Sequence, residues 1–325
     1  MRAAVSTAYG PPEVVQVRDV PAPEPGDGEV LVRARASTLE AALVAARAGT
    51  PWFARLAFGL RRPRYPVLGG VVAGEVVAVG PGVTRFAVGD RVVGVTRMGA
   101  GAHAVLVVLR ADGVVEPVPD GTSDVDAAVL ACGPLTALPF LQVHGRVRPG
   151  QSVLVIGASG CIGTAAVQVA AHAGARVTAV CGPRGLDLVR DLGAAEVVDR
   201  SVEDVTARDA RYDVVLDVAG ASSYRRCRRL LTDDGAYLVT VPSPGILWRT
   251  VRTSRRRRGR RGVVAFTGLR SETQKSEDLR TALRLGADGA LRPVVDAAYR
   301  LDDIAAAHHH VEHEHKAGTV VVLLA

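Results

Sequence analysis

The sequence predicts an α/β protein in which a compact β domain is followed by a doubly wound parallel sheet. The first part of the chain has short β-like runs between turn residues, and the middle alternates strand-like with helical segments. A glycine-rich turn ends the first strand of that middle part. Alternation of this kind is typical of a parallel sheet with helices on both faces. With 325 residues, the chain is long enough for two domains with separate cores.

The first domain is predicted from residue 1 to 122. Its β-like runs include VVQVRDV, EVLVRARAS and AHAVLVVL, and they are separated by the turn segments YGPPE, EPGDGE, GPG and PDG. Residues 123–285 form the second predicted domain, with strands at VLVI, RVTAV, EVVD, DVVLDV, AYLVTV and VVAFT. The tail, 286–325, is predicted to contain a helix around DDIAAAHHHVE and a final strand in GTVVVLLA.

The glycine-rich turn lies in VLVIGASGCIG, residues 153–163. Gly157 permits a tight turn after the strand, Gly160 lets the backbone approach a pyrophosphate, and Gly163 lets the next helix pack closely on the sheet. That helix would place Ile162, Ala166, Val169 and Ala173 near one face and direct its amino terminus at the anion. We interpret the segment as a dinucleotide site rather than an ordinary glycine-rich turn.

The second strand distinguishes between the two nicotinamide dinucleotides. An NAD site normally has an acidic residue at the end of this strand, about 20 residues after the glycines, which holds the ribose hydroxyls. Here RVTAV continues into Cys181, Gly182, Pro183 and Arg184. No acidic side chain is present here to repel a 2′-phosphate, and Arg184 could pair with that phosphate. We therefore predict NADP(H). The alternative is that Arg184 simply occupies a solvated helix start.

Composition excludes several classes of protein. No apolar run approaches the roughly 20 residues needed to span a bilayer, and the start lacks a secretory signal, so we expect a cytoplasmic protein without a membrane partner. The four cysteines are scattered, without a disulfide framework or zinc-type spacing. The net charge of +7 comes almost wholly from arginine, with a dense run in RTVRTSRRRRGRR, residues 249–261. We interpret this run, including Arg255 to Arg261, as a solvated connection, with an anion-binding rim as the alternative and nucleic acid unlikely.

Several segments together resemble a known family. EVLVRARAST, PVLGGVVAGEVVAVGPGVTRFAVGDRVVG, LACGPLTAL, VLVIGASGCIG and AHHHVEHEHKAGTVVV occur in the order found in the medium-chain dehydrogenase/reductase (MDR) superfamily, in its zinc-independent quinone oxidoreductase branch. The resemblance implies a GroES-like β domain completed by residues 286–325, a Rossmann domain at 123–285, and an active site in the cleft. It also implies hydride transfer from NADPH to a quinone or an α,β-unsaturated carbonyl, often in a homodimer.

The cofactor-binding candidates follow the strand ends of the predicted Rossmann domain. They are Gly157, Ala158, Ser159, Gly160, Cys161, Ile162, Gly163, Cys181, Arg184, Ala219, Val241 and Phe266.

Zinc is not expected. In the zinc enzymes of the superfamily a cysteine stands near Ser37 or Thr38, and a His-Glu pair stands at the positions of Gly70 and Val71; none of the residues here can ligate. The tail histidines His308, His309, His310, His313 and His315 are interpreted as a surface helix with incidental metal affinity.

The departures from the branch bear on the catalytic residues. Family reductases have Asn and Asp at the positions of Glu40 and Leu43, and an Asp at Val71. In an apolar cleft Glu40 would favour its neutral form and act as a general acid or base; facing solvent, it would be only a surface carboxylate. Trp52, Phe53 and Phe58 could stack on a flat polycyclic ligand, and Tyr65 could donate to its carbonyl. Thr136, in LACGPLTAL, completes the catalytic candidates.

Two functions therefore stay open. The leading one is an NADPH-dependent, zinc-independent reductase of quinones or α,β-unsaturated carbonyls. The alternative keeps the fold for non-redox biosynthetic chemistry, such as a cyclisation, addition or elimination, with Glu40 as acid/base. A sensor or nucleic-acid binder acting through the arginine run is a weaker third possibility.

Overall fold

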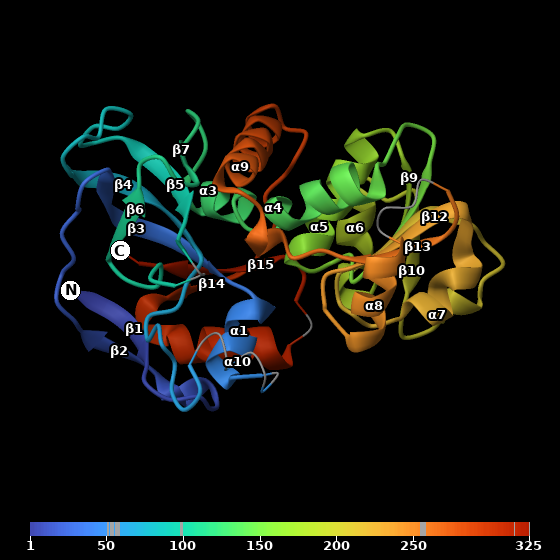
Figure 1. The fold of residues 1–325 in the computed structure, drawn as a ribbon, viewed down its shortest axis with the longest axis horizontal. Helices are drawn as coiled ribbons and strands as arrows, with labels where there is room; N and C mark the ends of the chain where they lie inside the picture. Colours follow the sequence, from blue (N-terminus) through green and yellow to red (C-terminus); the bar gives the residue numbers. More distant parts are fainter. Residues whose placement is uncertain are drawn as a thin grey trace. The chain divides into compact units, whose positions relative to one another are not determined.

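A computed structural model describes the chain except for residues 51, 53, 54, 56–58, 98, 99, 254–257, 315 and 325. Internal contacts divide it into two compact units (Figure 1). Unit 1 consists of Met1–Cys132, Ser271–Asp288 and Pro293–Ala325, and unit 2 of Gly133–Arg270 and Gly289–Arg292. This division differs from the predicted boundaries in three ways. It extends the first unit from residue 122 to Cys132, adds residues 271–285 to it, and assigns Gly289–Arg292 to unit 2.

Unit 1 is built on a mixed sheet in the order β14-β15-β3-β4-β5-β7, with β6 paired to β3. Strands β14 and β15 run parallel, and the other described pairs are antiparallel. The carboxy-terminal β15 pairs with β3, so the tail completes the β unit. A separate pair, β1 and β2, lies beside it. The strands are β1 Arg2–Ser6, β2 Val15–Asp19, β3 Glu29–Leu39, β4 Val71–Val79, β5 Arg91–Val95, β6 Leu106–Arg110, β7 Val115–Pro117, β14 Val295–Arg300 and β15 Thr319–Leu323.

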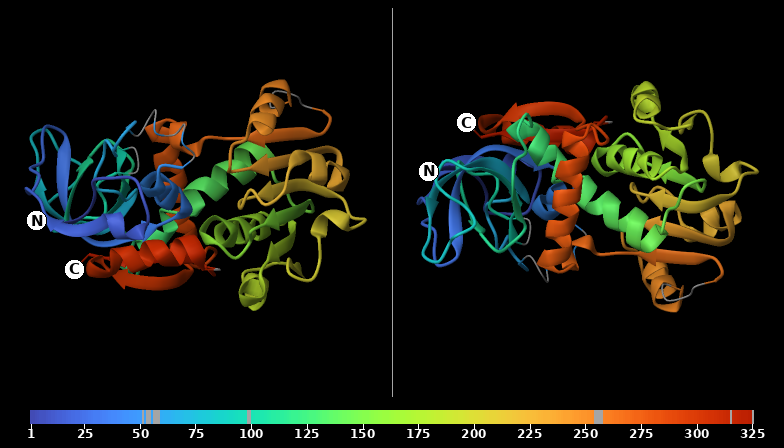
Figure 2. Two further views of the ribbon diagram at one scale, coloured as in Figure 1. Left: turned by 90° about the horizontal axis from the view of Figure 1, so that it is seen from below. Right: turned by 90° about the horizontal axis from the view of Figure 1, so that it is seen from above.

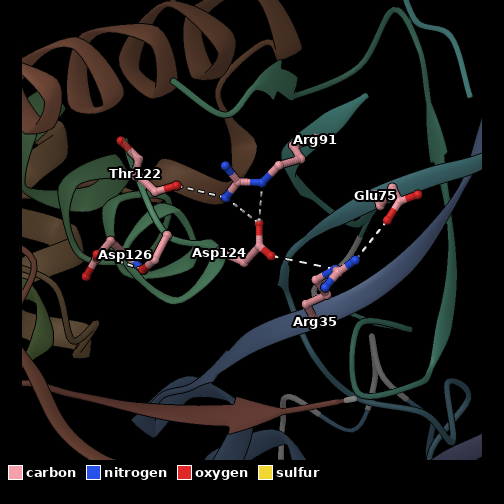
Figure 3. A network of polar contacts seen from close by, with 7 residues as sticks. Arg35, Glu75, Arg91, Thr122, Asp124 and Asp126 are labelled. Atoms are coloured by element: carbon pink, nitrogen blue, oxygen red, sulfur yellow. Dashed lines mark hydrogen bonds and ion pairs between the residues drawn. The ribbon is translucent and has the colours of Figure 1, made fainter. Parts of the chain in front are cut away.

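Polar contacts hold helix α3 (Asp124–Leu130) to this sheet, as Figure 3 shows. Arg91 on β5 donates to Asp124 at 2.8 Å and to the carbonyl oxygen of Thr122 at 2.8 Å. Arg35 on β3 bridges Glu75 on β4, at 2.9 Å, and Asp124, at 3.8 Å. The helix begins at Ser123, whose side chain accepts from the Asp126 amide. These contacts explain why the chain beyond residue 122 belongs to unit 1.

Three further helices lie in the described part of unit 1. Helix α9 (Glu272–Ala287) begins with a capping box between Ser271 and Gln274, and its Arg280 pairs with Glu116 on β7. Helices α1 (Ala41–Ala48) and α10 (Ile304–His313) lie side by side (Figure 1). Leu43 and Val44 of α1 and Ile304, Ala307 and Val311 of α10 are buried in the same apolar core as the sheet.

Unit 2 is a doubly wound parallel sheet, which confirms the predicted fold class. The strand order is β10-β9-β8-β11-β12-β13, with all pairs parallel. Helices lie on both sides, with α6 and α8 at opposite ends of the sheet (Figure 2). The strands are β8 Ser152–Ile156, β9 Arg176–Cys181, β10 Glu196–Asp199, β11 Tyr212–Asp217, β12 Leu231–Val239 and β13 Arg261–Val264. The helices are α4 Pro134–Leu138, η4 Pro139–Gly145, α5 Cys161–His172, α6 Leu186–Asp191, α7 Tyr224–Cys227 and α8 Pro244–Thr253, with short turns η5 Pro183–Gly185 and η7 Arg228–Leu230.

Among the described residues, one helical stretch, Asp124–Gly145, is long and apolar enough by composition to cross a membrane. The most apolar part of it is 72% buried inside the protein. Such burial is typical of a core helix, in which apolar residues pack against protein.

Candidate functional site

The glycine turn after β8 has the geometry of a phosphate cradle. Gly157 has a φ of +84°, and a side chain there would meet Ala219 at 2.9 Å. A methyl group on Gly163 would lie 2.1 Å from the Gly157 carbonyl oxygen, so only glycine lets α5 approach the strand this closely. At Gly160 the nearest atom would be 3.8 Å away, which leaves room beside the backbone. The geometry at Gly157 and Gly163 is compatible with the tight turn and the close helix packing expected there, and the approach of a pyrophosphate at Gly160 stays a prediction.

Helix α5 starts at this turn with an uncapped amino terminus. Its N-cap is Gly160, which has no side chain to accept from the first-turn N–H groups. A helix amino terminus of this kind binds phosphate through those N–H groups and the helix dipole. Ala158 is buried, and Ser159, Cys161 and Ile162 are partly buried around the turn. The cradle therefore fits a pyrophosphate.

The end of β9 carries no acidic side chain. Cys181 is buried, and burial raises the pKa of its thiol to about 11. Arg184 is exposed in η5, where Gly185 packs on Ser159; a methyl group on Gly185 would lie 2.4 Å from the Ser159 side chain. Arg184 therefore lies in a segment that packs beside the glycine turn, at the carboxyl ends of the neighbouring strands β8 and β9.

Sequence reasoning missed a second arginine at this edge, Arg200. It follows β10, its amide donates to the Cys181 carbonyl oxygen at 2.9 Å, and its Nε lies 3.4 Å from where a Gly182 side chain would begin. The signal was available, because the residue after the third strand of a parallel sheet lies next to the end of the second. Asp199, just before it, bonds the amide and hydroxyl of Ser201, and these bonds lower its pKa.

The other cofactor candidates of unit 2 follow the carboxyl ends of the next three strands. Ala219 follows β11 and is exposed beside Gly157. Val241 follows β12 and is 49% exposed, and Phe266 follows β13 and is 50% exposed. An open α/β sheet binds its ligand at the carboxyl ends of its strands, which is where these side chains lie.

Glu40 in unit 1 is partly buried and contacts a cysteine. It is the N-cap of α1, but its carboxylate makes no capping bond; instead it accepts a hydrogen bond from the Cys132 thiol at 2.7 Å. Burial raises the pKa of Glu40, whereas the thiol and the charge of Lys316 lower it by less. Cys132 was not predicted as a partner, because 92 residues separate it from Glu40.

The remaining catalytic candidates have different surroundings. Tyr65 is 37% exposed, with the Arg64 guanidinium 6.0 Å from its ring centre. Between described residues no hydrogen bond or ion pair joins it to Glu40. Thr136 is partly buried in α4 of unit 2. Trp52 is 75% exposed, whereas Phe53 and Phe58 lie outside the described residues.

The zinc positions of unit 1 hold no ligand set. Thr38 is buried on β3, Val71 begins β4, and Gly70 directly precedes that strand. No group of three or more His, Cys, Asp or Glu side chains that could hold a metal is found among the described residues.

The interpretation of the tail histidines as a surface helix is wrong for His308 and His310. His308 is 0% and His310 is 8% exposed, because α10 packs this face on the core of unit 1. His310 bonds Asp296 at 2.6 Å and Tyr299 at 3.0 Å. His309 and His313 face solvent and stack on each other at 4.4 Å, and His315 lies outside the described residues.

Known proteins share this architecture. A family model described as "Alcohol dehydrogenase GroES-like domain" matches residues 26–120, and one described as "Zinc-binding dehydrogenase" matches 192–322. The quinone oxidoreductase of Rattus norvegicus is 30% identical, over 100% of this chain and 98% of that protein. The solved quinone oxidoreductase of Coxiella burnetii superposes with a TM-score of 0.87 at 24% identity, over 100% of this chain and 99% of that one. A mycobacterial protein solved with NADPH is 27% identical, with a TM-score of 0.82, over 99% of this chain and 100% of that one.

Fold and sequence together define an oxidoreductase built from a GroES-like unit and a Rossmann unit. The chain belongs to the medium-chain dehydrogenase/reductase superfamily, in its zinc-independent, quinone oxidoreductase-like branch.

Proposed function

We propose that the protein is an NADPH-dependent reductase of a quinone or an α,β-unsaturated carbonyl compound that acts without zinc. The observation that carries this proposal is the cradle formed by Gly157, Gly160 and Gly163 before α5. Its open side at Gly160 fits a dinucleotide pyrophosphate. The name of the rat relative supports a quinone as substrate, and the NADPH bound to the mycobacterial relative supports the cofactor.

The choice of NADPH rests on two guanidinium groups. Arg184 and Arg200 lie at the neighbouring ends of β9 and β10, and no carboxylate ends β9. A 2′-phosphate would pair with these arginines through charge-assisted hydrogen bonds. Ala219, Val241 and Phe266 would hold the rest of the cofactor against the strand ends.

When bound, NADPH supplies the hydride for reduction. The residues of this chain then have to polarise the substrate carbonyl and move a proton. Tyr65 and Thr136 carry hydroxyl groups that can donate to a developing enolate oxygen. Glu40 can hold a proton nearer to neutral pH than an ordinary glutamate, because burial raises its pKa.

A second function is favoured by the surroundings of Glu40. A partly buried carboxylate with a raised pKa, bonded to the Cys132 thiol at 2.7 Å, suits acid/base catalysis of a redox-neutral reaction. In that case the protein would be a biosynthetic enzyme for a cyclisation, addition or elimination, and would use the cofactor fold as a scaffold.

Cofactor stoichiometry separates the two functions. Purified protein is incubated with NADPH and a panel of simple quinones and enones, and NADPH absorbance and product are followed together. The reductase requires one NADPH oxidised per product, and the redox-neutral reaction requires none. Glu40→Gln keeps shape and hydrogen bonding while it removes the charge. It should cost a reductase little but should slow a Glu40-dependent proton transfer by about 100-fold.

The resemblance also suggests a homodimer. Strand β13 is the last strand of the sheet in unit 2, with β12 as its one partner among the described strands. An edge strand presents backbone donors and acceptors that a second copy can pair. Sedimentation of the wild type should give the mass of two chains; a single chain at micromolar concentration would contradict the dimer.

A further inference from the structure

A pocket lies in unit 2, and none of its lining residues belongs to the glycine turn. It has a volume of about 420 Å³ and is lined by Tyr224, Arg228, Asp233, Arg249 and Arg260. These residues come from α7, η7, the start of β12, α8 and the segment before β13. None of them is among the predicted cofactor residues. The pocket is large enough for a small organic ligand.

Arg249 is held in place by an aromatic ring. Its guanidinium carbon lies 4.3 Å from the centre of the Tyr224 ring, whereas no described residue accepts a hydrogen bond from the guanidinium. Stacking orients a guanidinium while its N–H donors remain available in the plane of the group. Arg249 is therefore preorganised for an anion.

Arg228 and Arg260 surround the same space. Arg228 is exposed, and no described residue accepts a hydrogen bond from its side chain. Arg260 is fixed by the carbonyl oxygens of Leu231, at 3.1 Å, and Thr232, at 3.2 Å. Arg260 also forms an ion pair with Asp233 at 3.0 Å. Asp233 is the one acidic side chain among the described residues that line the pocket. Three guanidinium groups against one carboxylate leave the pocket positively charged.

We propose that this pocket binds a phosphate-bearing small molecule, at a site separate from the dinucleotide cradle. Guanidinium groups bind phosphate oxygens in pairs, and two groups without protein acceptors suit a ligand with at least two anionic oxygens. Arg249 covers one face of the Tyr224 ring, and we assign recognition in this pocket to the guanidinium groups and the phosphate that they would bind. Arg260, at the end of the arginine run, belongs to this anion site. Arg255 to Arg257 lie outside the described residues.

The test uses inorganic pyrophosphate as the probe and the full-length protein. The protein is first titrated with NADPH, so that the cradle is measured separately and then saturated. Pyrophosphate is titrated next by calorimetry at fixed ionic strength. We expect one further site, weakened about tenfold or more in Arg249→Ala and in Arg228→Ala, because each loses a charge-assisted contact. Arg211→Ala is the matched control, since Arg211 is exposed in unit 2 and pairs with Asp209.

Several results would overturn this assignment. Wild-type protein that binds no pyrophosphate once NADPH is saturating has no separate site. Binding that Arg249→Ala and Arg228→Ala leave unchanged belongs elsewhere, provided that their circular dichroism shows a folded protein. Binding of a single-stranded oligonucleotide without binding of pyrophosphate would indicate a nucleic-acid surface. If the wild-type protein binds no NADPH in the first titration, the proposed cofactor is contradicted instead. Failure of the proposed function and failure of the phosphate pocket are therefore distinguishable.

Discussion

Glu40 shows how one residue can be placed against its intrinsic preference. At the amino terminus of α1, a carboxylate would normally be stabilised in its charged form by the helix dipole. Here it makes no capping bond, turns to Cys132 and loses solvent, and burial raises its pKa. Keeping Glu40 ionised at neutral pH therefore costs folding free energy.

We expect Glu40→Gln to stabilise the protein at neutral pH. An acid whose folded pKa is raised is fully tolerated below its unfolded pKa, near 4.5, and its cost grows as the pH rises toward the folded pKa. Glutamine cannot ionise and can still accept from Cys132. Chemical denaturation at pH 7.5 and at pH 4 should thus show a gain for Glu40→Gln at the higher pH alone. An equal effect at both values would mean that ionisation is not the cause.

The second prediction at this scale concerns Arg184 and Arg200. If they bind the 2′-phosphate, NADPH should bind more tightly than NADH by about 1.5 to 3 kcal/mol, the range of a charge-assisted contact. The double substitution Arg184→Ala with Arg200→Ala should erase most of that preference and leave NADH affinity unchanged. Arg190→Ala, which removes an exposed arginine paired with Asp187, is the control. Equal affinity for both dinucleotides in the wild type would contradict the assignment.

At the scale of elements, α1 and α10 enclose a buried polar cluster in unit 1. Arg47 of α1 has a fully buried side chain and pairs with Glu312 of α10 at 2.6 Å. His103 reaches the Thr38 carbonyl oxygen at 3.1 Å, and both ring nitrogens of His308 lack a hydrogen-bond partner among the described residues. Burial lowers the pKa of His103 to about 4 and, with His103 and Arg47 nearby, that of His308 to about 3.

This cluster predicts a loss of stability in mild acid. Above pH 6.5 both histidines are neutral in the folded and unfolded states. As the pH falls from 6.5 toward 4, the unfolded chain binds protons that the folded chain excludes, at about 1.4 kcal/mol per histidine per pH unit. Denaturation midpoints at pH 7.5 and pH 4.5 measure the effect. His308→Asn should reduce the difference between them, whereas His309→Asn, on the exposed face of α10, should leave it unchanged.

For the whole molecule, patterns along the chain predicted the fold well and the contacts poorly. The period of each strand and the glycine spacing are local, so the parallel sheet and the cradle at Gly157 could be recognised without coordinates. The pair Glu40–Cys132 and the cluster around Arg47 join segments far apart in sequence, which no local periodicity reports. Arg200 is a different case, because the strand order of a doubly wound sheet places the residue after β10 beside the end of β9, so this position could have been predicted.

The last prediction concerns metal, since one matching family model carries zinc in its description. The positions that would ligate catalytic zinc are Thr38, Gly70 and Val71, and a catalytic site needs three protein ligands with an open position. We therefore expect full activity and an unchanged melting temperature after exhaustive dialysis against a strong chelator. A zinc-dependent alcohol dehydrogenase treated in parallel should lose activity, which verifies the treatment. Loss of activity in the present protein, restored by zinc and by no other divalent cation, would show that residues outside these positions hold a catalytic metal.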